Sequence, residues 1–171
     1  AVADCTVHGV PGAMVSVVCH NALNRALREF DLTKPAEILN KTREIVVETL
    51  QAEDQNVRDG MDISICALDL ETLQLEWAGA NNPLYLLKKG ENEITSILPD
   101  KQPVGRFEMG KPFTNHELQL AKGDTIYLFS DGFVDQFGGD KGKKYKYARF
   151  REKLISIGSK QMDDQKISLQ N

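Results

Sequence analysis

The sequence has few cysteines, no long apolar run and no excess of positive charge, and each absence excludes a class of protein. Its three cysteines, Cys5, Cys19 and Cys66, are odd in number and lack C-x-x-C spacing. This pattern argues against a disulfide framework or a thiolate zinc site and favours a reducing cytoplasm. No stretch approaches the roughly 18–20 apolar residues of a membrane-spanning helix. Acidic residues outnumber basic ones by 25 to 21, so the chain has no general attraction for nucleic acid.

The rest of the composition is that of a folded globular protein. Hydrophobic residues make up 41% and charged residues 27% of the 171 residues, a balance that separates the chain from disordered and fibrous proteins. The length predicts a single domain over 1–171. The chain begins inside what reads as a strand and ends in a helix-compatible stretch, so we expect a partial domain of a longer protein.

Apolar spacing predicts two helices ahead of a sheet and one after it. Apolar residues recur at helical spacing over about 13–30, which indicates a helix with one buried face. A second helix is expected to be capped by Thr33, to carry Pro35 in its first turn and to run to about residue 50. A last helix is expected over about 147–157.

Between these helices the apolar period changes from helical spacing to two. Residues 63–68 and 73–77 alternate and predict an antiparallel pair of strands. The short continuous runs 84–87 and 126–129 predict strands that are buried on both faces. A further strand is expected near 113–120. This order of elements predicts an α+β domain in which helices cover an antiparallel sheet or sandwich.

Two aspartates stand where a short apolar run ends and a glycine follows. Asp131 comes after the run 126–129 and precedes Gly132, while Asp4 precedes a glycine-bearing turn that opens the first helix near Gly12. Such carboxylates can hold Mg²⁺ or Mn²⁺, which prefer oxygen ligands, and backbone N–H groups at a helix start favour a phosphate. An ordinary Asp-Gly turn is the alternative for Asp131.

Other chemistries for these stretches have weaker support. Cys5 and His8 form C-x-x-H, but His20 and His116 stand alone and no further cysteine lies at ligand spacing, so neither a zinc site nor a thiol nucleophile is completed. The stretch around Asp131 is also similar to haloacid-dehalogenase phosphatases. Their nucleophilic aspartate would fall on Phe129, so that nucleophile is absent.

Four short stretches of the sequence carry a shared pattern: DCTVHGVPGA (4–13), DGMD (59–62), GANNP (79–83) and FSDGFVD (129–135). Together they resemble the SpoIIE-type bacterial serine phosphatases, which belong to the metal-dependent type 2C (PPM) superfamily. The first stretch resembles the family pattern D-x-[ST]-G-H-G-[VA]-x-[GA]-A, and the others follow in the family's order.

The resemblance implies a four-layer αββα sandwich with two Mn²⁺ or Mg²⁺ ions at one end of the packed sheets. Asp4 would bridge the metals, the Cys5 backbone carbonyl would be a second ligand, and Asp131 a third. A metal-activated water would attack phosphoserine or phosphothreonine of a phosphorylated regulatory protein. The expected residues lining the phosphate site are His8, Gly9, Gly12 and Gly132. The resemblance also implies upstream sensor domains in the same chain.

The chain departs from the family pattern at several places. Val7 stands where the family has glycine, and a β-branched residue tolerates a glycine-type backbone poorly. Two further family aspartates would lie in strands before residue 1 and after residue 171, so we expect a sandwich truncated at both ends. Loss of these carboxylates would weaken metal binding severely, so this segment alone could be inactive even where the full-length protein is an active phosphatase. The alternative to an active phosphatase is therefore an inactive module of the same fold that docks a phosphorylated regulator.

The remaining polar clusters are not assigned to the site. Asp163-Asp164 lacks a following apolar run and is interpreted as a solvated cluster. Asp59, Asp62 and Asn81-Asn82 could line the site, with Asp59 or Asp62 as an auxiliary ligand. An ordinary Asp-Gly turn and, for Asn81-Asn82-Pro83, turn chemistry are the preferred interpretations. The basic and aromatic stretch 141–147 is interpreted as a solvated loop, with a flap facing the substrate as the family analogy.

Overall fold

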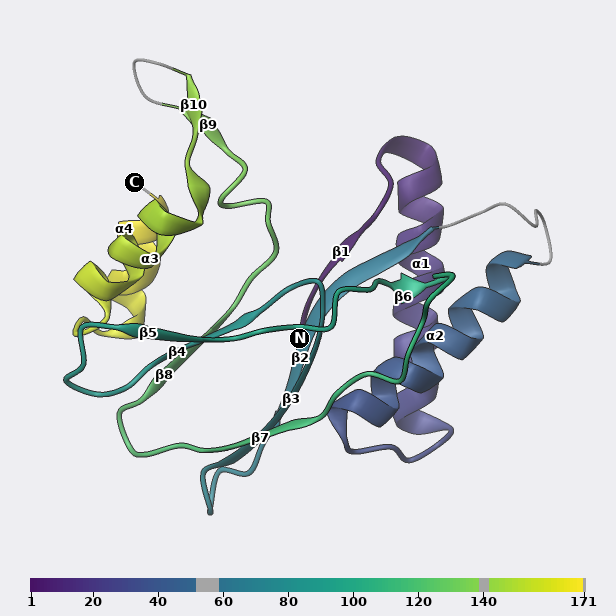
Figure 1. Ribbon diagram of the computed structural model, residues 1–171, viewed down its shortest axis with the longest axis horizontal. Helices are drawn as coiled ribbons and strands as arrows, with labels where there is room; N and C mark the ends of the chain where they lie inside the picture. The colour runs from purple at the N-terminus through teal and green to yellow at the C-terminus, as the bar shows by residue number, and fades with distance from the viewer. Residues whose placement is uncertain (52–58, 139–141, 171) are drawn as a thin grey trace.

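The computed structural model describes residues 1–51, 59–138 and 142–170, which form helices on the outside and two sheets between them (Figure 1). Helices α1 (Gly9–Arg28) and α2 (Pro35–Gln51) lie on one side. Helices α3 (Lys146–Ile157) and α4 (Met162–Gln170) lie on the other side. The order of layers is helices, sheet, sheet, helices, which is the αββα sandwich implied by the family resemblance.

The first sheet is antiparallel and packs against α1 and α2. Its strand order is β1-β2-β3-β7, and β6 pairs with the start of β2. The strands are β1 (Val2–Cys5), β2 (Gly60–Leu68), β3 (Gln74–Ala80), β6 (Val104–Gly105) and β7 (His116–Gln119). The predicted antiparallel pair is confirmed as β2 and β3.

The second sheet is also antiparallel and packs against α3 and α4. Its strand order is β5-β4-β8, with β4 (Leu84–Leu87) between β5 (Ile94–Ile97) and β8 (Thr125–Leu128). A short hairpin of β9 (Phe137–Gly138) and β10 (Lys143–Lys144) precedes α3.

Three apolar clusters fill the spaces between the layers. The first, which includes Val15 and Ile63, lies between α1, α2 and the first sheet. The second includes Trp77 and Leu84 and lies between the two sheets. The third lies between the second sheet and α3, where Tyr85 and other aromatic and aliphatic side chains are buried. Successive residues of β4 enter different clusters because strand side chains alternate.

This alternation explains one prediction that is confirmed and one that is confirmed only in part. β4 is buried along its whole length, as its continuous apolar run predicts. β8 has a similar run but is only partly buried, because it pairs with β4 on one side and is the last strand of the sheet. The expectation that 126–129 is buried on both faces is therefore confirmed only in part: its side chains pack into the clusters on both faces, but only Phe129 is buried.

Several predicted boundaries also need correction. Helix α1 begins at Gly9, before the predicted start. The carbonyl of Lys34, not of Thr33, accepts the first bond of α2, which makes Pro35 the first helical residue. Leu73 has φ of +59° and belongs to the turn before β3. The final residues form α4 as a separate helix.

A buried hydrogen bond joins β2 and β3 at the interface between the sheets. The indole Nε1 of Trp77 donates to Ser64 Oγ at 2.8 Å, and both residues are fully buried. We expect Ser64→Ala to lower the free energy of unfolding by about 1–3 kcal/mol, because the indole N–H would lose its partner. Urea unfolding measures this loss, with the exposed Ser159→Ala as the control. Equal stability of the two variants would contradict the role of the bond.

Candidate functional site

A small cavity gathers three carboxylates from both sheets at one end of the sandwich. Its volume is about 300 Å³. Asp4 and Asp62 come from adjacent strands of the first sheet, and Asp131 follows β8 of the second sheet. The lining residues are Asp4, Cys5, Thr6, Asp62, Asn82 and Asp131.

The pairing of β1 with β2 sets two of these carboxylates side by side. Asp4 lies directly opposite Asp62 in the antiparallel register, so the two side chains share one face of the sheet. Thr6 fastens the end of this pairing, because its N–H donates to the Gly60 carbonyl at 3.1 Å and its Oγ1 accepts from the Gly60 N–H at 3.1 Å. The start of β2 is thereby held against the end of β1.

The register also directs the side chain of Cys5 away from the cavity, while its backbone stays in the cavity wall. Cys5 follows Asp4, so its side chain points to the opposite face, where it packs with the first cluster beside Cys19. Burial, with a smaller effect of Cys5, raises the pKa of the Cys19 thiol to about 12, so this thiol stays protonated at neutral pH. Only the backbone of Cys5 is suited to a role in the cavity, and thiolate chemistry has no support here.

The turn between β3 and β4 holds Asp62 from the other side. Asn81 has a left-handed backbone with φ of +58°, a conformation that asparagine adopts more readily than most residues. Its Nδ2 donates to Asp62 Oδ1 at 2.8 Å, and its backbone N–H donates to the Asp100 carbonyl at 2.9 Å. Asn81 is therefore a positioning residue for Asp62.

The aromatic packing of Phe129 anchors the segment that carries Asp131. Phe129 is buried, and its ring centroid lies 4.7 Å from that of Tyr85 and 4.9 Å from that of Phe150. Two residues later Asp131 is exposed, and its carbonyl accepts from the Asp135 N–H at 2.9 Å. The apolar run thus ends in the third cluster and delivers a carboxylate to the cavity.

The electrostatics of the cavity suit a cation. Burial raises the pKa of the Asp62 carboxyl, and the charges of Asp131 and Asp4 raise it further, while the bond from Asn81 lowers it. A divalent cation would relieve the repulsion, and carboxylate and carbonyl oxygens are the donors that Mg²⁺ and Mn²⁺ prefer. Within 1–51, 59–138 and 142–170, however, no three acidic, cysteine or histidine side chains converge on one metal position. The donor chemistry fits, whereas the carboxylates share the cavity without enclosing a single centre.

The structure brings together only part of the predicted site. Asp4, Cys5 and Asp131 line the cavity, whereas His8, Gly9, Gly12 and Gly132 do not. His8 is exposed and precedes α1 without a side-chain capping bond. Among unassigned residues, Asp59 is also outside the lining.

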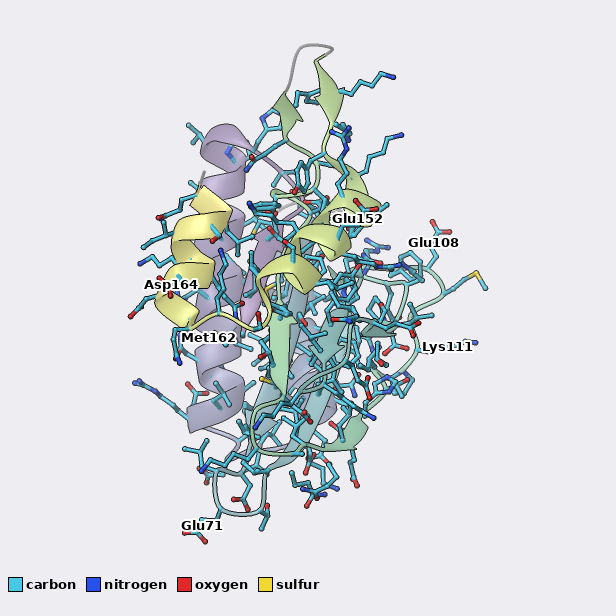
Figure 2. All side chains as sticks on the ribbon, turned by 90° about the vertical axis from the view of Figure 1, so that its left-hand side faces the viewer. Glu71, Glu108, Lys111, Glu152, Met162 and Asp164 are labelled. Atoms are coloured by element: carbon cyan, nitrogen blue, oxygen red, sulfur yellow. The ribbon has the colours of Figure 1, made fainter. Side chains whose placement is uncertain are left out.

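The aspartates near the end of the chain are not placed to act as metal ligands. Asp163 and Asp164 are exposed in the first turn of α4, and Figure 2 shows Asp164 on the outer side of this helix. The basic stretch 141–147 is mostly exposed as predicted, but it is not a loop, because Lys143–Lys144 form β10 and α3 begins at Lys146. Residue 141 lies outside the described residues, and Lys144 pairs with Asp135 at 2.8 Å.

Three residues that line the cavity are absent from the site assigned from the sequence, although Asp62 and Asn82 stood there as alternatives. These residues are Thr6, Asp62 and Asn82. The sequence did contain a signal for Asp62. Along β2, Asp62 shares one face with Ser64 and Cys66, while Ile63 lies on the opposite face. Nothing local distinguished Asn82 from an ordinary turn residue.

Val7, which stands where the family pattern has glycine, does not adopt a glycine-type backbone. Among the described residues with positive φ, Gly9 has φ of +70° and Val7 is not included, so the glycine-type conformation falls two residues later. Val7 is half-buried against the first cluster. Gly12 lies inside α1, where a Cβ atom would collide with the carbonyl of Val7.

The comparisons with known proteins identify the class. The sequence matches the family Stage II sporulation protein E (SpoIIE) over residues 1–169. The SiaA-PP2C domain of Pseudomonas aeruginosa is 29% identical with a TM-score of 0.84, and the match covers 98% of this chain and 64% of that one. No curated protein sequence matches the chain.

Two more distant structures share the fold. The match to a SpoIIE structure from Bacillus subtilis, which holds its PP2C phosphatase domain and part of its regulatory domain, covers 97% of this chain and 45% of that one, with 18% identity and a TM-score of 0.68. The match to RsbX in complex with magnesium covers 98% and 70%, with 15% identity and a TM-score of 0.63.

The fold, the cavity at the end of the sandwich and these comparisons define a PP2C-type phosphatase domain. The chain belongs to the SpoIIE family. It spans less than two thirds of the SiaA and SpoIIE chains that it matches. No helix in the described part of the chain has the length and apolar character needed to cross a membrane.

The close contact at Gly12 gives a test of the turn that carries Asp4. We expect Gly12→Ala to lower the free energy of unfolding by about 1–3 kcal/mol, because the added methyl meets backbone that cannot rotate away. Chemical unfolding measures the loss. Gly138→Ala is the control, since its added Cβ would meet none of the described residues within 4 Å. Unchanged stability of Gly12→Ala would contradict the packing of α1 on Val7.

The raised pKa of Asp62, which is caused mainly by burial and to a smaller extent by the charges of Asp131 and Asp4, gives a test of the cost of ionising this carboxyl. The folded state favours the protonated form of the Asp62 carboxyl. Protonation therefore adds to the free energy of unfolding at low pH, and this contribution is lost as the pH rises above the ordinary pKa of 3.8. We expect Asp62→Asn to be more stable than the natural chain at pH 7 without metal, and the gain to fade towards pH 4. Urea unfolding at both pH values measures it, with Asp163→Asn as the control. A lower stability of Asp62→Asn at pH 7 would contradict the cost of ionising the Asp62 carboxyl.

Proposed function

We propose that this chain is a metal-dependent phosphatase module that removes phosphate from serine or threonine of a regulatory protein in bacterial signalling. The observation that carries the proposal is the presence of Asp4, Asp62 and Asp131, from both sheets, in the lining of one cavity. Membership of a phosphatase family and the magnesium complex of RsbX, a more distant relative, support it. The proposal also includes upstream sensor domains in the same chain. It includes a cytoplasmic location, which the cysteine pattern favours.

The residues of the chain would divide the work by their chemistry. Asp4, Asp131 and the Cys5 carbonyl would hold Mn²⁺ or Mg²⁺, two ions in a complete site, and such ions supply an activated water and neutralise phosphate charge. Asn81 fixes the Asp62 carboxylate by its hydrogen bond. The open geometry leaves room for a phosphate group beside the carboxylates.

A second candidate function is an inactive module of the same fold that docks a phosphorylated regulator. The observation that favours it is the lack of a converged metal-ligand cluster among the residues described. Such a module would bind a phosphopeptide without turnover. Calorimetry with a phosphoserine peptide, combined with an activity assay, separates the two candidates.

Replacement of the carboxylates tests the phosphatase proposal. We expect the protein to hydrolyse p-nitrophenyl phosphate and a phosphoserine peptide with Mn²⁺ but not with EDTA. Asp4→Asn and Asp131→Asn should each lower kcat/KM at least about 100-fold, since even outer partners of metal ligands cost 10–100-fold. Asp163→Asn, an exposed aspartate on α4, is the control.

Two results would distinguish the metal-dependent phosphatase from the docking module. Full activity of both variants would refute the metal site. Absence of turnover by the natural chain, together with phosphopeptide binding, would favour the docking module instead. Thermal unfolding of each variant checks that it remains folded.

A further inference from the structure

Asn82 carries a buried side-chain donor that has no partner. The residue is only 6% exposed, and its Nδ2 atom has no hydrogen-bond partner among the described residues. The same residue lines the carboxylate cavity. An amide donor withdrawn from water without a partner is uncommon, because the lost hydrogen bonds destabilise the folded state.

The neighbouring residue shows that this feature is particular to Asn82. Asn81 stands in the same turn, and its amide donates to Asp62 at 2.8 Å. The backbone N–H of Asn82 is also satisfied, by the Ala80 carbonyl at 2.7 Å. Among these donors of the turn, only the Asn82 side-chain Nδ2 lacks an acceptor among the described residues. It belongs to a residue in the wall of a cavity with room for a small ligand.

The surroundings indicate what kind of acceptor the amide would meet. A lysine or arginine at this position would pair with Asp4, Asp62 or Asp131 and compete with a cation for them. A neutral amide binds an oxyanion without that competition.

We propose that the Asn82 amide donates a hydrogen bond to a phosphoryl oxygen of a phosphate group bound in the carboxylate cavity. The inference rests on the proposed function, because a phosphate needs a cation beside three carboxylates. Asn82 thereby becomes a substrate-contacting residue, while Asn81 remains a positioning residue for Asp62. The two adjacent asparagines serve the anion and the carboxylate respectively.

Direct binding measurements test the role of Asn82. Calorimetry gives the Kd for Mn²⁺, and then the Kd for inorganic phosphate at saturating Mn²⁺. We expect Asn82→Ala and the similarly sized Asn82→Leu to raise the phosphate Kd about tenfold, as for the loss of one hydrogen bond to a charged group. The Mn²⁺ Kd should stay within about twofold. The control is Asn92→Ala, at an exposed position in the turn between β4 and β5.

Thermal unfolding without ligand distinguishes a binding role from a structural one. We expect the melting temperature of Asn82→Leu to be equal to or above that of the natural chain, because the variant removes a donor that has no partner. A lower melting temperature together with weaker Mn²⁺ binding would show that Asn82 supports the fold or the carboxylates, and would overturn the inference.

The remaining outcomes separate this inference from the function on which it rests. If the natural chain binds Mn²⁺ and phosphate, and both Asn82 variants bind phosphate equally well, the inference fails and the proposed function stands. If the natural chain binds neither Mn²⁺ nor phosphate, the proposed function fails and the inference fails with it.

Discussion

The antiparallel register of β1 and β2 is the constraint on which the site depends. It sets Asp4 opposite Asp62, and residues paired in this way must share a face of the sheet. The same register sends Cys5 and Ile63 to the other face, where the helices bury them. A shift by one residue would exchange the two faces, placing carboxylates in the helix core and apolar side chains in the cavity. The packing of α1 and α2 therefore enforces the position of the carboxylates.

The second sheet completes the site through a different kind of anchor. Asp131 has no register partner, because it follows the end of β8. Its position depends on Phe129, which is fixed among aromatic rings of the third cluster. One side of the cavity is thus set by strand pairing and the other by side-chain packing against α3. Relative movement of the two sheets would change the spacing between Asp131 and the other two carboxylates.

The sequence predicted what depends on local pattern and missed what depends on pairing. Alternation identified β2 and β3, and a continuous apolar run identified the buried β4. The run at β8 resembled that of β4, yet only the strand order shows that β8 is the last strand of its sheet. Asp4 and Asp131 were selected from their neighbours in the sequence, whereas Asp62 enters the cavity because β1 pairs beside it. The family pattern has glycine at the position of Val7, whereas the structure places the left-handed conformation at Gly9.

The turn between β3 and β4 shows why chemically identical neighbours can differ in role. Asn81 adopts a left-handed backbone that turns the chain and aims its amide at Asp62. That conformation sends the next side chain, Asn82, into the buried wall of the cavity without a partner. The cost of an unsatisfied donor is tolerated where a ligand can supply the acceptor, as strained or unpaired groups tend to gather at functional sites. The same two residues that read as turn chemistry in the sequence thus connect the geometry of the fold to the chemistry of the cavity.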